Sequence, residues 1–196
     1  IGSAGIVNFA NALATRGLFA SIEGLGIQNN DVGGDGMRAL SKAAIGGAMS
    51  KLVWLDVSDT PIGDDGFGSL VQAPAAGGLR NLRWIGASGN SIGDAGVGVL
   101  STMSRDAFSH KLQGIQGIQG IQGIQGIDLS QNNIGDEGLC ALAAGSGPLD
   151  ALWMLNLSAN AFELEPAGAG LRALAAALRG GGFRAKGHLK HIKPTA

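Results

Sequence analysis

The chain has 196 residues, of which 35 are glycine and five are proline, and its formal net charge is −1. This length suits one domain with a sizeable core, and no hydrophobic run approaches the roughly 18 residues that a membrane-spanning helix needs. Cys140 is the only cysteine, so an intrachain disulfide is excluded, which suits a reducing compartment.

The small net charge conceals an asymmetry along the chain. Residues 1–165 carry 8 Lys and Arg against 15 Asp and Glu, whereas residues 166–196 carry six Lys and Arg and no acid. A basic end on an acidic body can contact nucleic acid or an acidic partner, but charges this widely spread also suit a solvated end. We expect a monomer that binds neither nucleic acid nor a membrane.

The chain begins inside a sequence pattern that recurs further on. Ile1-Gly-Ser-Ala-Gly5 matches the middle of one repeat unit, and no initiating Met precedes it. We therefore expect the natural N-terminus to lie upstream, together with any targeting signal. No signal peptide is visible, and a cytoplasmic location is the expectation.

Five short hydrophobic segments then follow one another with the same internal spacing. Each has aliphatic residues at its first, fourth and sixth positions, and they begin at Ile22, Leu52, Leu82, Ile124 and Leu152. In the second segment, Leu52, Leu55 and Val57 have the spacing of a short strand with a buried face. Successive segments begin 30, 30, 42 and 28 residues apart, which indicates a repeat array rather than a disordered glycine-rich chain.

A turn and a helix are predicted after each strand. Asn at the turn, replaced by Thr60 in the second repeat, can hydrogen-bond backbone groups of its own and adjacent repeats, and Thr60 should do so less well. The acids of the following Ile-Gly-x-x-Gly stretch, such as Asp64 and Asp65, are expected to cap a helix. Apolar residues ten and thirteen positions beyond the sixth strand position share a helical face: Met37, Phe67, Val97 and Leu139, with Leu40, Leu70, Leu100 and Leu142.

The longest interval contains a run of Ile-Gln-Gly triplets. Removing four triplets, or 12 residues, restores a spacing of 30, so we interpret residues 112–123 as an insertion by triplet expansion. Because each triplet imitates the opening of a strand, several registers are nearly equivalent. We expect Ile124, Ile127 and Leu129 to occupy the strand and the additional residues to loop out.

The pattern L-x-x-L-x-L-x-x-N with a period near 30 resembles leucine-rich repeats of the ribonuclease-inhibitor-like class. The resemblance implies an α/β solenoid that is curved, with parallel strands on its concave face, helices on its convex face, and about five full repeats plus partial ends. The solenoid is predicted over residues 1–188, with a partial repeat or basic tail at 189–196. Its units are a partial repeat at 1–21, full repeats at 22–51, 52–81, 82–111, 124–151 and 152–188, and the insert at 112–123.

Side chains between the inward residues of each strand should face solvent on the concave face. Trp54 and Trp84 occupy the same strand position in consecutive repeats, so their indoles are expected to be neighbours. Exposed Trp is typical of interface hot spots, although the two rings could simply cover each other and nearby glycines. Trp153 is expected to pack toward a repeat edge. The predicted partner-binding residues are Trp54, Trp84, Asp56, Arg83, Asp128, Met154 and Asn156.

No motif supports catalysis or cofactor binding. The phosphate-binding and dinucleotide-binding glycine motifs are absent, and His188 and His191 have no acid or cysteine close by in sequence. The paired acids at Asp136 and Glu137 are explained by their place at a predicted helix start. We therefore expect no enzymatic activity, no cofactor and no metal ion.

The resemblance implies a non-catalytic module that binds a protein partner on the concave face. Two alternatives remain open. One is a GTPase-activating protein similar to the Ran activators, although those carry an acidic tail and this chain ends with basic residues. The other is the sensor segment of a larger NOD-like receptor.

Overall fold

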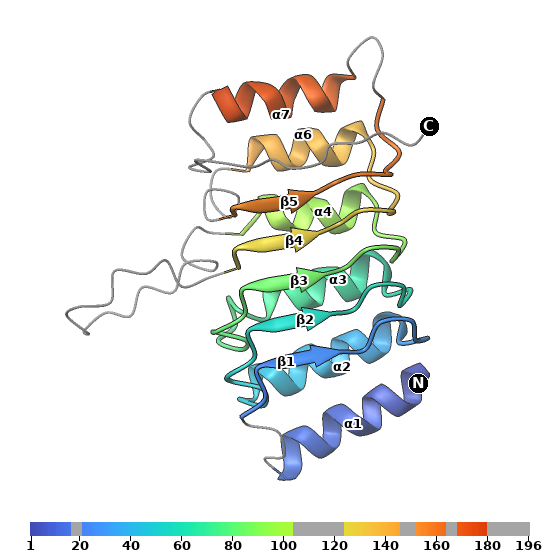
Figure 1. Ribbon diagram of the computed structural model, residues 1–196, viewed down its shortest axis with the longest axis vertical. Helices are drawn as coiled ribbons and strands as arrows, with labels where there is room; N and C mark the ends of the chain where they lie inside the picture. Colours follow the sequence, from blue (N-terminus) through green and yellow to red (C-terminus); the bar gives the residue numbers. More distant parts are fainter. Residues whose placement is uncertain (17–20, 104–123, 146–151, 164–167, 180–196) are drawn as a thin grey trace, which may run out of the picture.

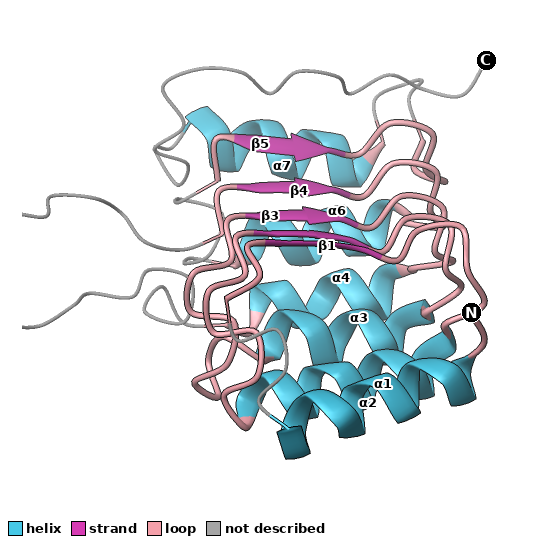
Figure 2. Ribbon diagram, turned by 60° about the horizontal axis from the view of Figure 1, so that its bottom comes forward, coloured by secondary structure: helices cyan, strands magenta, loops and turns pink. Residues whose placement is uncertain are grey.

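A computed structural model of the chain describes residues 1–16, 21–103, 124–145, 152–163 and 168–179 (Figure 1). Within these residues, five short strands form one sheet in chain order, and every pairing is parallel. The helices form a second layer on one side of the sheet (Figure 2). The chain therefore builds a two-layer stack in which strand and helix alternate, and the predicted α/β solenoid architecture is confirmed.

The middle residues of the strands form one row across the sheet. They run from Leu25 through Leu55, Ile85 and Ile127 to Leu155 as Cα partners. From Leu55 onward they are at most 3% exposed, whereas Leu25 at the edge is half-buried. The fourth position of the repeat pattern thus points into the core, as predicted. The strands are β1 (Gly24–Gly26), β2 (Trp54–Asp56), β3 (Trp84–Gly86), β4 (Gly126–Asp128) and β5 (Met154–Asn156).

Consecutive helices pack side by side and close the core from behind. The apolar positions predicted on the inner face of the helices, ten and thirteen residues beyond the strand pattern, are at most 2% exposed. This burial confirms the predicted helical face. The described helices are α1 (Ser3–Arg16), α2 (Gly33–Ile45), α3 (Gly63–Gln72), α4 (Asp94–Ser101), α6 (Asp136–Ala144) and α7 (Ala169–Arg179).

The Ile-Gln-Gly run leads into β4 at its last triplet, and the three aliphatic residues predicted for this strand segment face the core. Ile124, Ile127 and Leu129 are at most 1% exposed, and Ile127 is the Cα partner of Ile85. Only the last triplet is followed by an aliphatic residue at the sixth position of the pattern, because earlier triplets place glycine there. Burial of Leu129 therefore favours this register. The predicted insert at 112–123 and the segment at 189–196 lie outside the described residues.

We call the contact between two consecutive repeats a junction and name it by its strands. Asparagine side chains connect the repeats at the later junctions. At the β2–β3 junction, Asn90 Nδ2 donates to the Val57 carbonyl at 2.8 Å, and Asn90 Oδ1 accepts the Thr60 N–H at 3.1 Å. Asn132 and Asn160 make equivalent bonds across the next two junctions. The predicted role of these asparagines is therefore confirmed.

Thr60 occupies the asparagine position of the second repeat and is completely buried. Its hydroxyl donates to the Val57 carbonyl in its own repeat and lies 3.2 Å from Asn90 Oδ1 in the next. Among the described residues, the Thr60 side chain bonds to no group in the repeat that contains β1. The β1–β2 junction consequently lacks the bridge that asparagine provides elsewhere.

The acids at the helix starts act between repeats, which corrects the expectation that they cap their own helices. Asp64 Oδ1 accepts the N–H of Gly93 in the next repeat at 2.6 Å, and Asp94 Oδ1 accepts that of Gly135 at 2.6 Å. Asp136 Oδ1 is 3.2 Å from the N–H of Glu163. No described N–H of their own helices donates to these carboxylates. Each of these aspartates thus forms a second bridge across its junction.

The glycine at the start of each helix, either its first residue or the residue just before it, adopts a different conformation where this bridge is missing. Gly93 and Gly135, whose N–H groups donate to an aspartate, are extended, with φ of −106° and −100°. Gly63 has a φ of +61°, and the repeat before it has Gly34 where the later repeats have the bridging aspartate. Gly33, which follows the acid-free start of α1, has a φ of +64°. A carboxylate from the preceding repeat therefore accompanies the extended form, and the left-handed form, which suits glycine, occurs without it.

Candidate functional site

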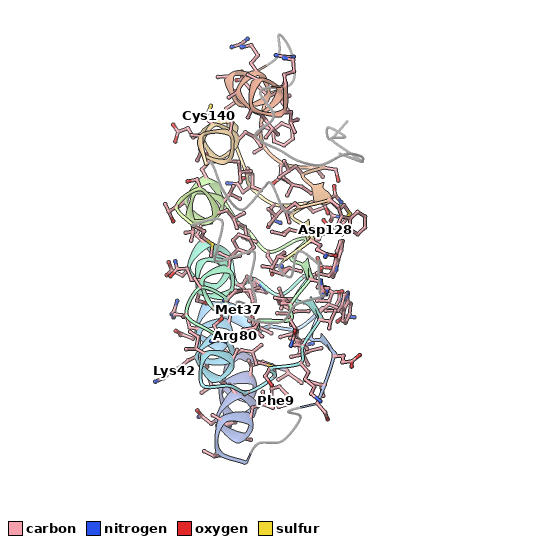
Figure 3. All side chains as sticks on the ribbon, turned by 90° about the vertical axis from the view of Figure 1, so that its left-hand side faces the viewer. Phe9, Met37, Lys42, Arg80, Asp128 and Cys140 are labelled. Carbon is pink, nitrogen blue, oxygen red and sulfur yellow. The ribbon has the colours of Figure 1, made fainter. Side chains whose placement is uncertain are left out.

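The side chains that point away from the helices form one surface, which we call the strand face. Figure 3 shows Asp128 on this side, whereas Lys42 and Cys140 lie on the helix side. The strand face has two rows, because the register aligns the first residues and the third residues of the strands. The first row is Gly24, Trp54, Trp84, Gly126 and Met154, and the second is Gly26, Asp56, Gly86, Asp128 and Asn156.

Trp54 is a large exposed residue of the first row, with 39% of its surface accessible. Its ring lies along β1, because that strand has glycine at both outward positions. A Cβ placed on Gly24 would be 3.5 Å from Trp54 Cε3, and one placed on Gly26 would be 3.5 Å from Cη2. The β1 backbone therefore supports the indole from below and fixes its orientation, while the remaining ring surface is open to a partner.

Trp84 packs toward the opposite neighbour, β4. A Cβ on Gly126 would be only 2.5 Å from Trp84 Cε3, so glycine is required beneath this ring. Trp54 and Trp84 are Cα partners, as predicted. The Trp54 ring lies over glycines of β1 and the Trp84 ring over Gly126 of β4, so the two rings lean toward opposite neighbouring strands. The physical reason is that glycine on each outer strand leaves a flat backbone surface for one ring.

The two carboxylates of the second row differ in their hydrogen bonds. Asp128 Oδ1 accepts from the Ser130 N–H at 2.9 Å and the Ser130 hydroxyl at 2.6 Å, and its Oδ2 accepts from Asn156 Nδ2 at 3.2 Å. Among described groups, Asp56 Oδ1 accepts only the Ser58 N–H, at 2.9 Å. Within the described residues, Asp56 Oδ2 has neither a hydrogen-bond nor an ion-pair partner. Both Asp128 oxygens therefore have hydrogen-bond partners, whereas the Oδ2 atom of Asp56 is available to a ligand.

Glycines also surround Asp56 on the adjacent strands. Gly26 and Gly86 are its Cα partners on β1 and β3. A Cβ on Gly86 would be 2.8 Å from Asp56 Oδ1, so the carboxylate leans over this glycine. The side chains of Gln28 and Trp54 lie over Gly26, so the half-buried Asp56 is bordered by the indole on the β1 side.

Of the other predicted site residues, Met154 and Asn156 lie at the β5 end of the two rows, and Arg83 lies outside them. Arg83 directly precedes β3, is half-buried, and forms no ion pair with a described acid. Met154 is half-buried on β5. Asn156 Oδ1 accepts from the Ser158 N–H at 3.1 Å and its hydroxyl at 2.8 Å. Asn156 therefore connects the Asp128 carboxylate to the Ser158 turn and holds this end of the face in place.

Trp153 is a candidate that the sequence analysis left out. It was expected to pack toward a repeat edge, yet 54% of its surface is exposed. Trp153 directly precedes β5, just as Val53 precedes β2 and Arg83 precedes β3. Val53 and Arg83 are half-buried. The residue before each strand thus lies at the margin of the strand face. The repeat alignment alone could have identified this third row.

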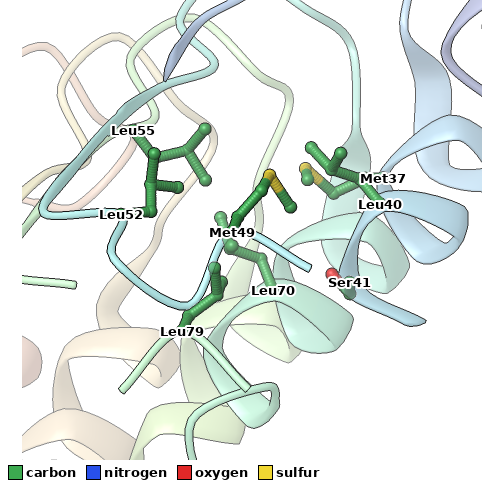
Figure 4. Close-up of a pocket in the computed structure, with 8 residues that line it drawn as sticks. All are labelled: Met37, Leu40, Ser41, Met49, Leu52, Leu55, Leu70 and Leu79. Atoms are coloured by element: carbon green, nitrogen blue, oxygen red, sulfur yellow. The ribbon is translucent and has the colours of Figure 1, made fainter. Parts of the chain in front are cut away.

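Other kinds of site find no support among the described residues. They include no group of three or more His, Cys, Asp or Glu that could hold a metal ion. The hollow in Figure 4 lies between core residues such as Met37, Met49, Leu55 and Leu70 and has no room for a water molecule. No described helix is both long and apolar enough to span a bilayer. The strand face is therefore the candidate site, and it is an open surface rather than a pocket.

Comparison with known proteins agrees with the repeat architecture. A family model described as leucine-rich repeat matches residues 125–143, which include all of β4 and most of α6. No curated protein matches the chain in sequence. The tropomodulin C-terminal domain of Caenorhabditis elegans is similar in structure, with a TM-score of 0.55 and 16% identity, over 90% of this chain and 92% of that one. An internalin (inlF) of Listeria monocytogenes aligns with a TM-score of 0.47 and 18% identity, over 87% of this chain and 35% of that one.

Proposed function

Since the chain is a leucine-rich-repeat solenoid, we propose that it is a non-catalytic module that binds a protein partner across its strand face, the concave face of the predicted solenoid. The observation that carries the proposal is the Trp54 indole, which is 39% exposed and packed on the glycines of β1. An indole that is both exposed and held in place can be buried by a partner with little loss of side-chain entropy. Trp is also enriched among interface residues that dominate affinity.

The shape of the surface favours a protein over a small molecule. Small ligands bind mostly in concave pockets that bury most of their surface, whereas the strand face presents five aligned strands without an enclosed cavity among the described residues. Its exposed groups are an indole, carboxylates, hydroxyls and amides in fixed rows. Such a combination of an apolar centre and a polar margin is typical of protein interfaces. No feature of the described residues favours GTPase activation or a receptor sensor over this simpler function.

Affinity capture from native lysate tests the proposal with two matched variants. Trp54→Ala removes the exposed indole of the strand face, and Gln72→Ala alters an exposed residue on α3, on the helix side. We expect a partner to be retained by wild type and Gln72→Ala and to be lost, by about tenfold or more, with Trp54→Ala, as hot-spot substitutions require. Circular dichroism checks that all three proteins fold. Equal capture by all three would contradict a strand-face interface.

A further inference from the structure

We propose that the strand face recognises a basic segment of the partner and places an Arg or Lys side chain between the Trp54 indole and the Asp56 carboxylate. The inference rests on the proposed protein-binding function and specifies the chemistry of the partner. It follows from the charges of the strand face, from the hydrogen bonds that distinguish its two aspartates, and from the packing of Trp54.

The parallel strands separate charges of opposite sign. Because every pairing is parallel, the strands end at a common edge, where Asp56 closes β2 and Asp31 and Asp59 stand in the turns that follow. Lys51 and Arg83 instead precede strands, at the opposite edge. Glu23, before β1, is the acidic exception there. The carboxyl edge around Asp56 is thus acidic, which suits a cationic side chain.

These carboxylates are not neutralised within the described part of the chain. Its two ion pairs both involve Arg38, with Asp35 and Asp65 on α2 and α3. Asp31, Asp56 and Asp59 therefore have no ion-pair partner among the described residues. A partner that supplied positive charge would be attracted to these carboxylates over roughly a Debye length, about 8 Å at physiological salt.

Trp54 and Asp56 are positioned to bind one cation together. They lie on the same face of the sheet two residues apart, about 6.6 Å along a strand. The indole extends over Gly26 of β1 and the carboxylate leans toward Gly86 of β3, so a cation would lie between them. A cation is attracted to an indole within about 6 Å of the ring, so a group above Trp54 can also reach the free Oδ2 of Asp56. A guanidinium suits both contacts, because it stacks on an aromatic face while its N–H groups donate to a carboxylate. A single available carboxylate oxygen is a poor metal site, and the described residues offer no third ligand.

Asp128 provides a matched comparison within the same row. It lies on the other side of Gly86 from Asp56, at the equivalent strand position. Its two oxygens already accept three hydrogen bonds from Ser130 and Asn156, whereas Asp56 accepts one from Ser58. The two aspartates should therefore contribute unequally to binding, although their formal charges are equal.

Fluorescence anisotropy with the full chain and short synthetic peptides tests the proposal. The probe is a labelled extended peptide in which Arg alternates with Ser, and the control replaces each Arg by citrulline, a neutral molecule of nearly the same shape. We expect the Arg peptide to bind at least about tenfold more tightly than the citrulline peptide, as loss of a charged partner implies. Asp56→Asn should weaken binding of the Arg peptide by about tenfold and Asp128→Asn by less than about twofold.

Two further variants separate the indole from general charge attraction. Trp54→Phe keeps an aromatic ring and should retain much of the affinity, whereas Trp54→Ala should lose it with the fold preserved by circular dichroism. Equal effects of Asp56→Asn and Asp128→Asn would overturn the proposed site, and so would equal binding of the two peptides. If no peptide binds while Trp54→Ala still releases the captured partner, the basic segment is refuted and the protein-binding function stands.

The test also identifies other occupants of the same surface. Dimerisation of the chain alone that Asp56→Asn abolishes, measured by analytical ultracentrifugation, would assign the strand face to a second copy and overturn the proposal. Tighter peptide binding by more than about tenfold after deletion of residues 180–196 would instead show that the chain's own basic segment occupies the face. That result would overturn the proposed partner as well.

Discussion

The β1–β2 junction and the β3–β4 junction have the same strand pairing but differ in their buried polar contacts. At β3–β4, Asn132 and Asp94 each bridge the two repeats with backbone hydrogen bonds. At β1–β2, Thr60 and Gly34 stand at the corresponding positions, and the described part of the chain shows neither bridge. The comparison shows that a regular backbone can conceal unequal coupling, because a solenoid is held together by separate nearest-neighbour contacts.

The difference matters for the candidate site, because the Trp54 side chain spans the β1–β2 junction, which has fewer polar bridges. Its ring belongs to the second repeat and packs on Gly24 and Gly26 of the first. Leu25, between these glycines, is also less buried than its partners in the other strands. A partner that covered Trp54 would therefore also hold the first repeat against the second.

The largest expected effect comes from breaking the stronger junction with Asn132→Ala. This change removes bonds to the Ala87, Leu129 and Ser130 carbonyls and to the N–H groups of Asn90 and Ile92. Leaving several such backbone groups without partners should lower the free energy of unfolding by about 3 kcal/mol or more. Urea denaturation measures the loss. A loss below about 1 kcal/mol would mean that water replaces the amide without penalty.

A smaller loss is expected for Asp94→Ala, which removes the second bridge of the same junction. The N–H of Gly135 loses its acceptor, and the free energy of unfolding should fall by about 1–2 kcal/mol. Glu137→Ala is the matched control, because this exposed acid at the start of α6 makes no described hydrogen bond. Equal losses for the two variants would point to the general charge at the helix start instead of the bridge.

The smallest expected effect is a gain in stability when the missing asparagine is restored at the β1–β2 junction. Thr60→Asn introduces the amide that the later repeats use, at a position where the residue is fully buried. We expect the free energy of unfolding to rise by about 1 kcal/mol, the usual net contribution of a hydrogen bond. Differential scanning calorimetry measures the change. Destabilisation would show that the first repeat does not present its backbone groups as the later repeats do.

The fold could be predicted because its determinants are periodic along the sequence. Leu55, Ile127 and the turn asparagines occupy fixed positions in each repeat, and the burial of an aliphatic row together with the backbone needs of a turn explains them. Even the β4 register followed from the pattern, since Leu129 completes it only after the last triplet. The aspartate bridges were not predicted, because Asp94 and Gly135 are 41 residues apart and only stacking brings them together.

The sequence predicted which residues share the strand face, but it did not predict their side-chain orientations or hydrogen bonds. The sequence placed Trp54, Trp84, Asp56 and Asp128 on one face, but it did not reveal that the two indoles lean apart. That orientation depends on which neighbouring strand carries glycine, as Gly126 does beneath Trp84. The difference between the aspartates likewise depends on side chains of adjacent strands and turns, which a single repeat does not contain.

Native-state hydrogen exchange tests the unequal coupling of the junctions most directly, because the two junctions contain matched amides. The Ile27 N–H donates to the Asp56 carbonyl at 2.9 Å across β1–β2, and the Ala87 N–H donates to the Asp128 carbonyl at 2.9 Å across β3–β4. We predict that Ile27 exchanges at least about tenfold faster, since opening the first junction breaks fewer buried bonds. Equal protection of Ile27 and Ala87 would contradict a weak first junction.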